Sequence, residues 1–351
     1  MTASRSLQCW QGVGLRASHA SDPWKTVVLM IPAQPTPTRP PSPWVVTDSS
    51  DAPIGDVSGR VLRQRLGAVR EALDEACLEQ DDPKHIHRLR VSIRRALATV
   101  SAFRDLLPRK RRRWFERSLR RIRRAAGAAR DLDVIVARFG HDSDRRDGQS
   151  DGPAAAARRR LTAMLSRERI GSRQPVEEIH TAIANADWHG RVNALVGRIS
   201  AGKRGQRPLR DYAERRLRPL LRRFLNHAKG RRLRDEADLH HLRLEGKRLR
   251  YTLEIFASVF PDHVRARCER SLESMQERLG EFTDHATAAN RMRSWADRHI
   301  KGLERSELVA IRKQESVHAA RARRAFIRWW SPSRRRALQR RIERTLRRVT
   351  A

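Results

Sequence analysis

The chain has 351 residues, of which 39% are hydrophobic, so it can bury the core of one large or two medium-sized domains. Its 76 Lys and Arg against 40 Asp and Glu give a formal net charge of +36, which is typical of proteins that meet a polyanion: a nucleic acid, a membrane surface or polyphosphate. The three cysteines, Cys9, Cys77 and Cys268, are widely spaced, which argues against a disulfide framework. No apolar run approaches the ~18–20 residues of a membrane span, which argues against a transmembrane helix. We therefore expect a soluble, cytoplasmic protein.

Residues 1–53 are rich in Pro, Thr and Ser, as in IPAQPTPTRPPSPW, and show no helical periodicity. We interpret them as a disordered tail. The apolar run TVVLMI at 26–31 is shorter than the ~7–15 residues of a signal-peptide core, and no cleavage site follows it. Both Met1 and Met30 are candidates for the first residue.

From about Val57 onward, Arg, Ala, Leu and Glu dominate, and apolar residues recur at steps of three and four. Such spacing predicts amphipathic helices that bury one stripe each. The clearest stripes are Leu62, Leu66, Val69, Leu73 and Ala76; Leu89, Ile93, Ala96, Val100, Phe103 and Leu107; and Leu242, Leu249, Leu253, Phe256 and Phe260. Predicted breaks are 81–83, Pro108, Gly127, 140–153, 201–208, Pro261, Gly280 and Pro332. We therefore expect an all-α fold of about ten to twelve helices.

An internal repeat relates the two halves of the chain. Residues 87–131 align without a gap with 240–284, and the shared positions include His87/His240, Phe103/Phe256, Pro108/Pro261, Gly127/Gly280 and Asp131/Asp284. Matches of His, Phe, Pro, Gly and Asp in one register are not expected from Arg-rich composition alone. The repeat predicts two pseudo-symmetric helical bundles from an internal duplication, over 54–203 and 204–351.

Each copy of the repeat carries a row of cations beside its apolar stripe. On a helix of about 100° per residue, His87, Arg90 and Arg94 fall together at roughly 100–160° from the stripe. His240, Arg243 and Lys247 do so in the second copy, with Arg250 at the edge. Donors at ~5 Å intervals suit a chain of phosphates. A solvated face with ordinary intrahelical ion pairs is the alternative, which the repetition in register and the large excess of positive charge disfavour.

These strings resemble the CHAD family, the conserved-histidine α-helical domain. The resemblance rests on IHRLRVSIRR with GAARDLDV, and on LHHLRLEGKRLRYTLEIF with RLGEFTDHATAA, and it covers roughly residues 57–350. It implies two pseudo-symmetric helical bundles beside a basic cleft that binds inorganic polyphosphate, in domains often linked to polyphosphate granules or metabolism. The residues it implies as contacts are His87, Arg90, Arg94, Arg95, His240, Arg243, Lys247, Arg248 and Arg250.

The two copies differ at the end of the string. Leu97 stands in the first copy where Arg250 stands in the second, so the first row has lost one cation. Glu254 can pair with Arg250 at the i,i+4 distance and weaken its contact with an anion.

Catalysis and metal binding have weaker signals. Asp131, Asp133, Asp284 and His285 could join His87 and His240 in a metal or phosphohydrolase site, but we expect the aspartates to cap helices or form salt bridges. The chain contains no ExExK or P-loop motif. We therefore expect no enzyme activity, no metal and no cofactor.

Non-specific nucleic-acid binding is the main alternative function. The runs 109–124 and 323–348 mix arginines with the aromatics Trp114, Phe115, Phe326, Trp329 and Trp330, which could stack on single-stranded bases. Helical spacing of Phe115 with Leu119 and Ile122 favours a core role for the aromatics. We expect weak nucleic-acid binding from charge alone. Electrostatic association of helix 333–350 with a membrane surface ranks last, because few bulky apolar residues could insert.

Overall fold

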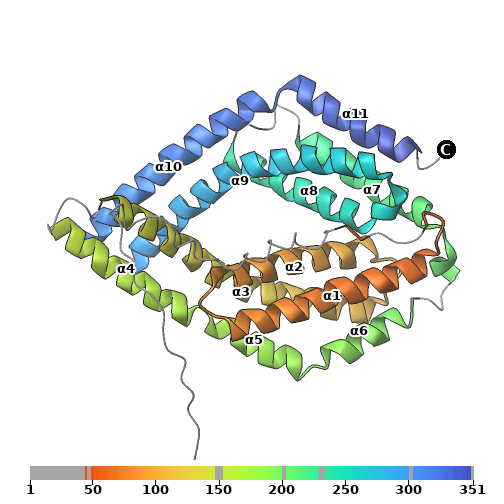
Figure 1. Cartoon of the computed structure of the whole chain (residues 1–351), viewed down its shortest axis with the longest axis horizontal. Coiled ribbons are helices and arrows are strands. Elements are labelled where there is room, and N and C mark those ends of the chain that lie inside the picture. The colour runs from red at the N-terminus through yellow and green to blue at the C-terminus, as the bar shows by residue number, and fades with distance from the viewer. Residues whose placement is uncertain are drawn as a thin grey trace, which may run out of the picture. The chain divides into compact units, whose positions relative to one another are not determined.

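The computed structural model describes residues 44–45, 49–146, 153–199, 203–228, 233, 235–299 and 303–348. Within these ranges the chain forms eleven α-helices and no strand, which confirms the all-α fold (Figure 1). The helices are α1 (Ile54–Leu78), α2 (Pro83–Ala102), α3 (Arg109–Arg146), α4 (Pro153–Gly171), α5 (Gln174–Ala184), α6 (Trp188–Val196), α7 (Leu209–His227), α8 (Glu236–Ile255), α9 (Asp262–His299), α10 (Leu303–Trp329) and α11 (Pro332–Arg348), with short 3-10 helices η1 (Lys203–Gln206) and η3 (Ala257–Val259).

Most of the predicted tail, Met1 and Met30 included, lies outside the described residues. Its described residues are 44–45 and 49–53, and the first two contact the helices through hydrogen bonds. Trp44 Nε1 donates a hydrogen bond to Glu269 Oε2 at 2.9 Å, and the buried Val45 donates its backbone N–H to the carbonyl of Glu254 at 3.0 Å. The end of the predicted tail therefore packs on α8 and α9.

The helices that carry the repeated strings start at aspartate caps. Asp82 precedes α2 and accepts a hydrogen bond from Lys84 N at 2.8 Å, and Pro83 occupies the first helical position. Asp235 precedes α8 and accepts from Asp238 N at 2.7 Å. Each cap satisfies a backbone N–H that the helix leaves without a partner.

The predicted breaks at Gly127 and Gly280 are wrong. Helix α3 runs through Gly127 and α9 through Gly280, because a single glycine costs only about 1 kcal/mol in a helix that packs along its length. The missing side chain makes room for an arginine at Gly280 only, because a Cβ at Gly127 would be in ordinary van der Waals contact with its neighbour. A Cβ at Gly127 would lie 3.5 Å from Arg90 Nη1, and one at Gly280 would lie 3.1 Å from Arg243 Nη2.

The predicted helix caps at Asp131 and Asp284 are wrong for the same reason, since both residues lie inside long helices. The salt-bridge alternative holds. Asp131 of α3 pairs with Arg291 of α9, and Asp284 of α9 lies 3.6 Å from Arg243 of α8. Asp133 is buried and accepts from Arg169 and Arg173 at 2.8 and 2.9 Å.

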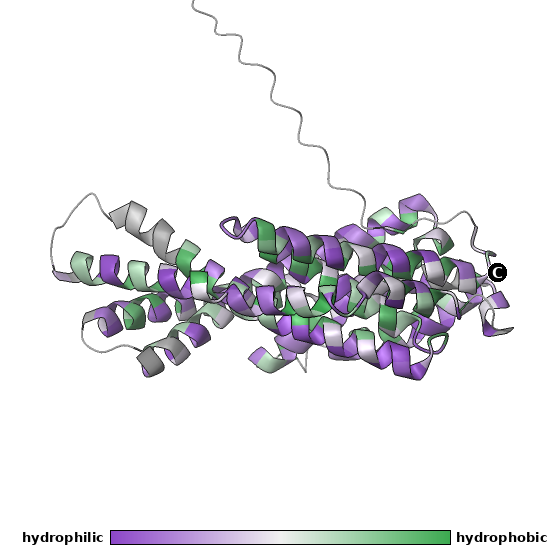
Figure 2. Cartoon of the chain, turned by 90° about the horizontal axis from the view of Figure 1, so that it is seen from below, coloured by the Kyte–Doolittle hydropathy of each residue, from purple (hydrophilic) through white to green (hydrophobic). Residues whose placement is uncertain are grey.

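All the apolar stripes named from the sequence are buried in one core, to which both predicted bundles contribute. In this core α1 packs on α2, α7 on α8, and α2 on α8. A smaller core holds Ile135, Leu161, Leu165, Met292, Leu308 and Ile311, where the C-terminal parts of α3 and α9 meet α4 and α10. Figure 2 shows hydrophobic and hydrophilic residues alternating along the helices of both regions. The boundary between 54–203 and 204–351 stays a prediction.

The helices follow the register of the predicted repeat. Helix α8 begins and ends 153 positions after α2, as the bounds 83 and 236 show, and α9 has the same offset from α3. The paired placement of Gly127 with Arg90 and Gly280 with Arg243 follows the same register. Duplication as the origin of the two halves stays a prediction.

Candidate functional site

The two predicted cation rows lie on helices that pack against each other, α2 and α8 (Figure 1). His87, Arg90 and Arg94 occupy α2, and His240, Arg243 and Lys247 occupy α8. The charges of Arg94 and Arg90 act on Lys247 across this contact, and the charge of Lys247 in turn acts on His87. The structure thus brings the two rows together.

Lys247 lies among these cations and is partly removed from water. Its side chain is half-buried, and burial together with the neighbouring Arg243 and Arg94 lowers its pKa to about 7. Removal from water disfavours the ammonium, and nearby cations disfavour it further. An anion placed among these groups would reverse the second effect and draw a proton onto Lys247.

Three further arginines join the rows from α3 and α9, and the sequence analysis missed them. Burial, followed by the charges of Arg94, Arg130 and Arg123, lowers the pKa of Arg90 to about 10. Burial and the charge of Arg90 lower the pKa of Arg291 to about 10. We call the whole set the basic cluster: His87, Arg90, Arg94, Arg123, Arg130, His240, Arg243, Lys247 and Arg291.

A sequence signal for these three residues did exist. Arg123 and Arg130 are seven positions apart, with Gly127 between them, so all three lie on one face of α3. Arg90 of α2 lies close to this face at Gly127. Arg291 follows the second repeat on α9, and its aligned position, 138, is also arginine.

Most of the basic cluster forms no ion pair with a described acidic residue, although the charge of Asp284 also acts on Lys247. Among the residues that the structure describes, Arg90, Arg94 and Lys247 form no ion pair or hydrogen bond. The Nε atoms of Arg94 and Arg243 are buried without an acceptor. Buried donors are nearly always paired in folded proteins, so these two atoms suit a ligand that supplies hydrogen-bond acceptors. The two acidic contacts are Asp284 with Arg243 and Asp131 with Arg291.

The two histidines are neutral at pH 7 in this setting. Partial burial and the charges of Arg130 and Arg94 lower the pKa of His87, and partial burial and Arg243 lower that of His240. Both therefore lie below the ordinary value of about 6.5 and offer a neutral N–H donor to an anion.

Three predicted contact residues are engaged elsewhere. Arg95 Nε donates to Glu254 Oε2 at 2.8 Å, and Arg250 Nε donates to Glu254 Oε1 at 3.4 Å, as expected for the i,i+4 pair. Arg65 of α1 lies 3.8 Å from the same carboxylate, which is only 1% exposed. Arg248 is largely exposed and pairs with Glu245 on its own helix. The contacts with Glu254 hold α1, α2 and α8 together.

The structure also places the aromatic residues that could have served nucleic-acid binding, and it bears on membrane and metal sites. Phe115, Phe326 and Trp330 are buried in the main core, and Trp114 and Trp329 pack against it, as the helical spacing predicted. No described helix has the length and apolar character that crossing a membrane requires. Within the described ranges, no three His, Cys, Asp or Glu residues gather in a way that could hold a metal ion.

Fold and site together define an all-helical protein that gathers basic side chains from four helices on one surface. The chain belongs to the CHAD family: the sequence model of the CHAD domain matches residues 60–293. Its fold is similar to the crystal structure of the CHAD domain from the plant Ricinus communis, with a TM-score of 0.62, 20% identity, and coverage of 81% of this chain and 94% of that one.

A second similar structure is PptA from Streptomyces chartreusis, with a TM-score of 0.54 and 20% identity. The match covers 80% of this chain and 99% of that one. No curated protein matches the chain in sequence.

Proposed function

We propose that the basic cluster binds inorganic polyphosphate and that the protein is a non-catalytic binding protein. The observation that carries this proposal is the set of unpaired cations on α2 and α8, with the Nε atoms of Arg94 and Arg243 buried and lacking acceptors. A chain of phosphates offers several charged acceptors in succession, and each can take up an arginine fork or a lysine ammonium. The resemblance to the CHAD family supports the same ligand.

Polyphosphate fits the site better than a nucleic acid. Single-stranded nucleic acids are bound mainly by aromatic side chains that stack on bases, combined with cations for the backbone. The aromatic side chains near the basic runs pack in or against the core, while the basic cluster itself consists of phosphate-seeking groups. The net charge of +36 still gives the protein a weak affinity for any nucleic acid at low salt. Location in the cytoplasm, at polyphosphate granules, is part of this proposal.

The proposal is tested by comparing two triple variants. One replaces His240, Arg243 and Lys247 of the basic cluster by Ala. The other replaces Arg336, Arg340 and Arg344 of α11, which are exposed and spaced by one turn. Hydrogen bonds to charged groups contribute about 1.5–3 kcal/mol each, so the first variant should bind polyphosphate at least about 30-fold more weakly.

The α11 variant should lose less than about threefold, because exposed and dispersed charges contribute little. Equal losses in both variants would show a diffuse charge effect and contradict a defined site. Gel analysis of polyphosphate after long incubation tests the absence of catalysis, since a binding protein leaves the chain length unchanged.

A further inference from the structure

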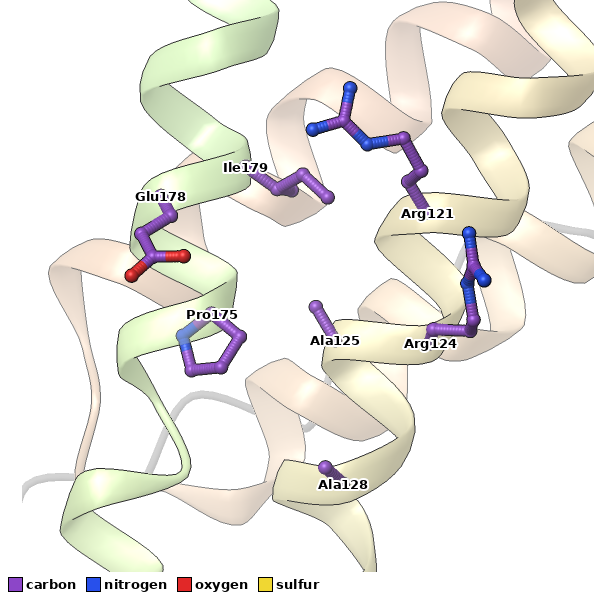
Figure 3. A pocket seen from close by; sticks show the side chains of 7 residues that line it. All are labelled: Arg121, Arg124, Ala125, Ala128, Pro175, Glu178 and Ile179. Atoms are coloured by element: carbon purple, nitrogen blue, oxygen red, sulfur yellow. The ribbon is translucent and has the colours of Figure 1, made fainter.

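A groove between α3 and α5 lies apart from the basic cluster. Figure 3 shows its larger part, a cavity of about 350 Å³ whose walls include Ala125 and Ala128 of α3 and Ile179 of α5. A smaller cavity of about 90 Å³ shares Arg121 and Ile179 with the first and extends to Trp114. Because they share walls, we treat the two cavities as one feature, the α3–α5 groove. Its lining is mostly apolar and small.

The α3 side of the groove carries cations without partners. Arg121 and Arg124 line it and are exposed, and Arg117 lies one turn before Arg121 on the same helix face. None of the three forms an ion pair or hydrogen bond with a described residue. Ser118 also lines the groove, is only 8% exposed, and has no hydrogen-bond partner in the described part of the chain. The groove thus joins apolar walls to unused polar groups.

The α5 side has the opposite charge. Glu178 lines the groove there (Figure 3). It accepts a hydrogen bond from Gln174 Nε2 at 3.0 Å. A ligand in the groove therefore meets positive charge along α3 and negative charge along α5. A ligand with negative charges must place them on the side that faces α3.

The groove is independent of the proposed polyphosphate site. Helix α3 turns by about 100° per residue, which places Ala125 and Arg121 roughly opposite Arg123 and Arg130 around the helix axis. Arg123 and Arg130 belong to the basic cluster, whereas Arg121 and Ala125 line the groove. One helix thus serves two surfaces.

We propose that the α3–α5 groove docks an amphipathic helix of a partner protein whose acidic residues lie along one edge of its apolar face. Apolar side chains at i, i+3 or i+4, and i+7 would fill the groove, and carboxylates would pair with Arg121 and Arg124. Trp114 and Ala128 are 14 positions apart, a span of about 21 Å that accommodates roughly four helical turns. The Ser118 hydroxyl is available to one polar group of the partner.

Charge complementarity selects this occupant. A second copy of a chain with net charge +36 would bring positive charge to the same rim. A nucleic acid or polyphosphate would satisfy the arginines but would leave the apolar walls exposed to water. Only a ligand with both apolar side chains and carboxylates uses the whole surface.

The test uses displayed libraries of 18-residue peptides, each with at least four Asp or Glu, panned against the full chain at about 150 mM salt. The selected peptides should carry apolar residues at helical spacing with acids beside them. Their affinity should fall at least about tenfold, or 1.4 kcal/mol, in the variant Ala182→Trp, which fills the groove from α5. The double variant Arg121→Glu and Arg124→Glu should cause a similar loss.

Ala184→Trp is the matched control, because Ala184 is exposed on the same helix but does not line the groove. It should leave peptide binding unchanged, and Ala182→Trp should leave polyphosphate binding unchanged, so the two proposals fail separately. Selection of no peptide, selection of peptides without apolar spacing, or equal binding to wild type and Ala182→Trp would each overturn the proposal.

Discussion

Arg95 of α2 donates a hydrogen bond from Nε to the buried carboxylate of Glu254 on α8 at 2.8 Å. The contact joins the two helices that carry the cation rows, and Arg65 and Arg250 complete the ring of charge around Glu254. Because the side chains of Arg95 and Arg250 pair with Glu254, their main role is to fix α2 against α8. The structure therefore separates residues that position the basic cluster from residues that are free to meet an anion.

Glu254→Gln should unfold far more readily than wild type. Removing one partner of a buried ion pair leaves the remaining charges without compensation, so we expect the free energy of unfolding to fall by about 3 kcal/mol, measured by urea titration. The control is Glu304→Gln, whose partner Arg160 is mostly exposed, so this substitution should change the free energy of unfolding far less. An equally small effect of both substitutions would contradict a structural role for Glu254.

Polyphosphate affinity should decrease as the pH rises from about 7 to 9. The pKa of Lys247 is about 7 in the free protein, and a bound anion raises it, so the complex holds a proton that the free protein has lost. Binding is then coupled to proton uptake across that interval. Isothermal titration in two buffers of different ionisation enthalpy measures the uptake directly.

In Lys247→Met the proton uptake between pH 7 and 9 should disappear. Its persistence would assign the uptake to another group. Below about pH 6.5 a second rise in affinity should remain, because His87 and His240, whose pKa values are lowered in the free protein, gain protons when an anion binds.

Asp284→Asn should bind polyphosphate about two- to fivefold more tightly. Asp284 lies 3.6 Å from Arg243 and competes with an anion for it, and exposed pairs of this kind contribute up to about 1 kcal/mol. Asp297→Asn on the same helix makes the same change in net charge away from the basic cluster. A gain of equal size in both variants would mean that only net charge matters.

Gly280→Ala should stabilise the protein and weaken polyphosphate binding. Alanine in a helix interior is favoured over glycine by about 1 kcal/mol, but its Cβ would lie 3.1 Å from Arg243 Nη2 and displace the guanidinium. Gly67→Ala is the control, because nothing lies within 4 Å of its Cβ and only stability should change. Unaltered binding in Gly280→Ala would show that the position of Arg243 is not critical.

Local patterns predicted the helices well because each apolar stripe is written within one helix. Leu89, Ile93 and Ala96 are all buried where the spacing of three and four placed them. The same local reasoning failed at Gly127 and Gly280, where packing overrides the weak helix propensity of glycine. The function of a glycine that admits an arginine from another helix becomes visible only in three dimensions.

Part of the basic cluster was predictable because the positions of residues around a single helix follow from their spacing. The rows on α2 and α8 follow from helix geometry, whereas Arg291 belongs to the cluster through the tertiary packing of α9. The pairing of Arg250 with Glu254 was predicted from their i,i+4 spacing and is confirmed. The attachment of Arg95 to the same carboxylate spans 159 positions and has no local signal.

The most direct test of the central claim is a competition titration with the full chain at about 150 mM salt. Labelled long-chain polyphosphate is displaced by unlabelled polyphosphate, single-stranded RNA or duplex DNA, all matched in phosphate concentration. A site made of unpaired phosphate-binding groups predicts that polyphosphate competes at least about tenfold better than either nucleic acid. Equal competition by RNA or DNA would make the basic cluster a generic cationic surface and would contradict the proposed function.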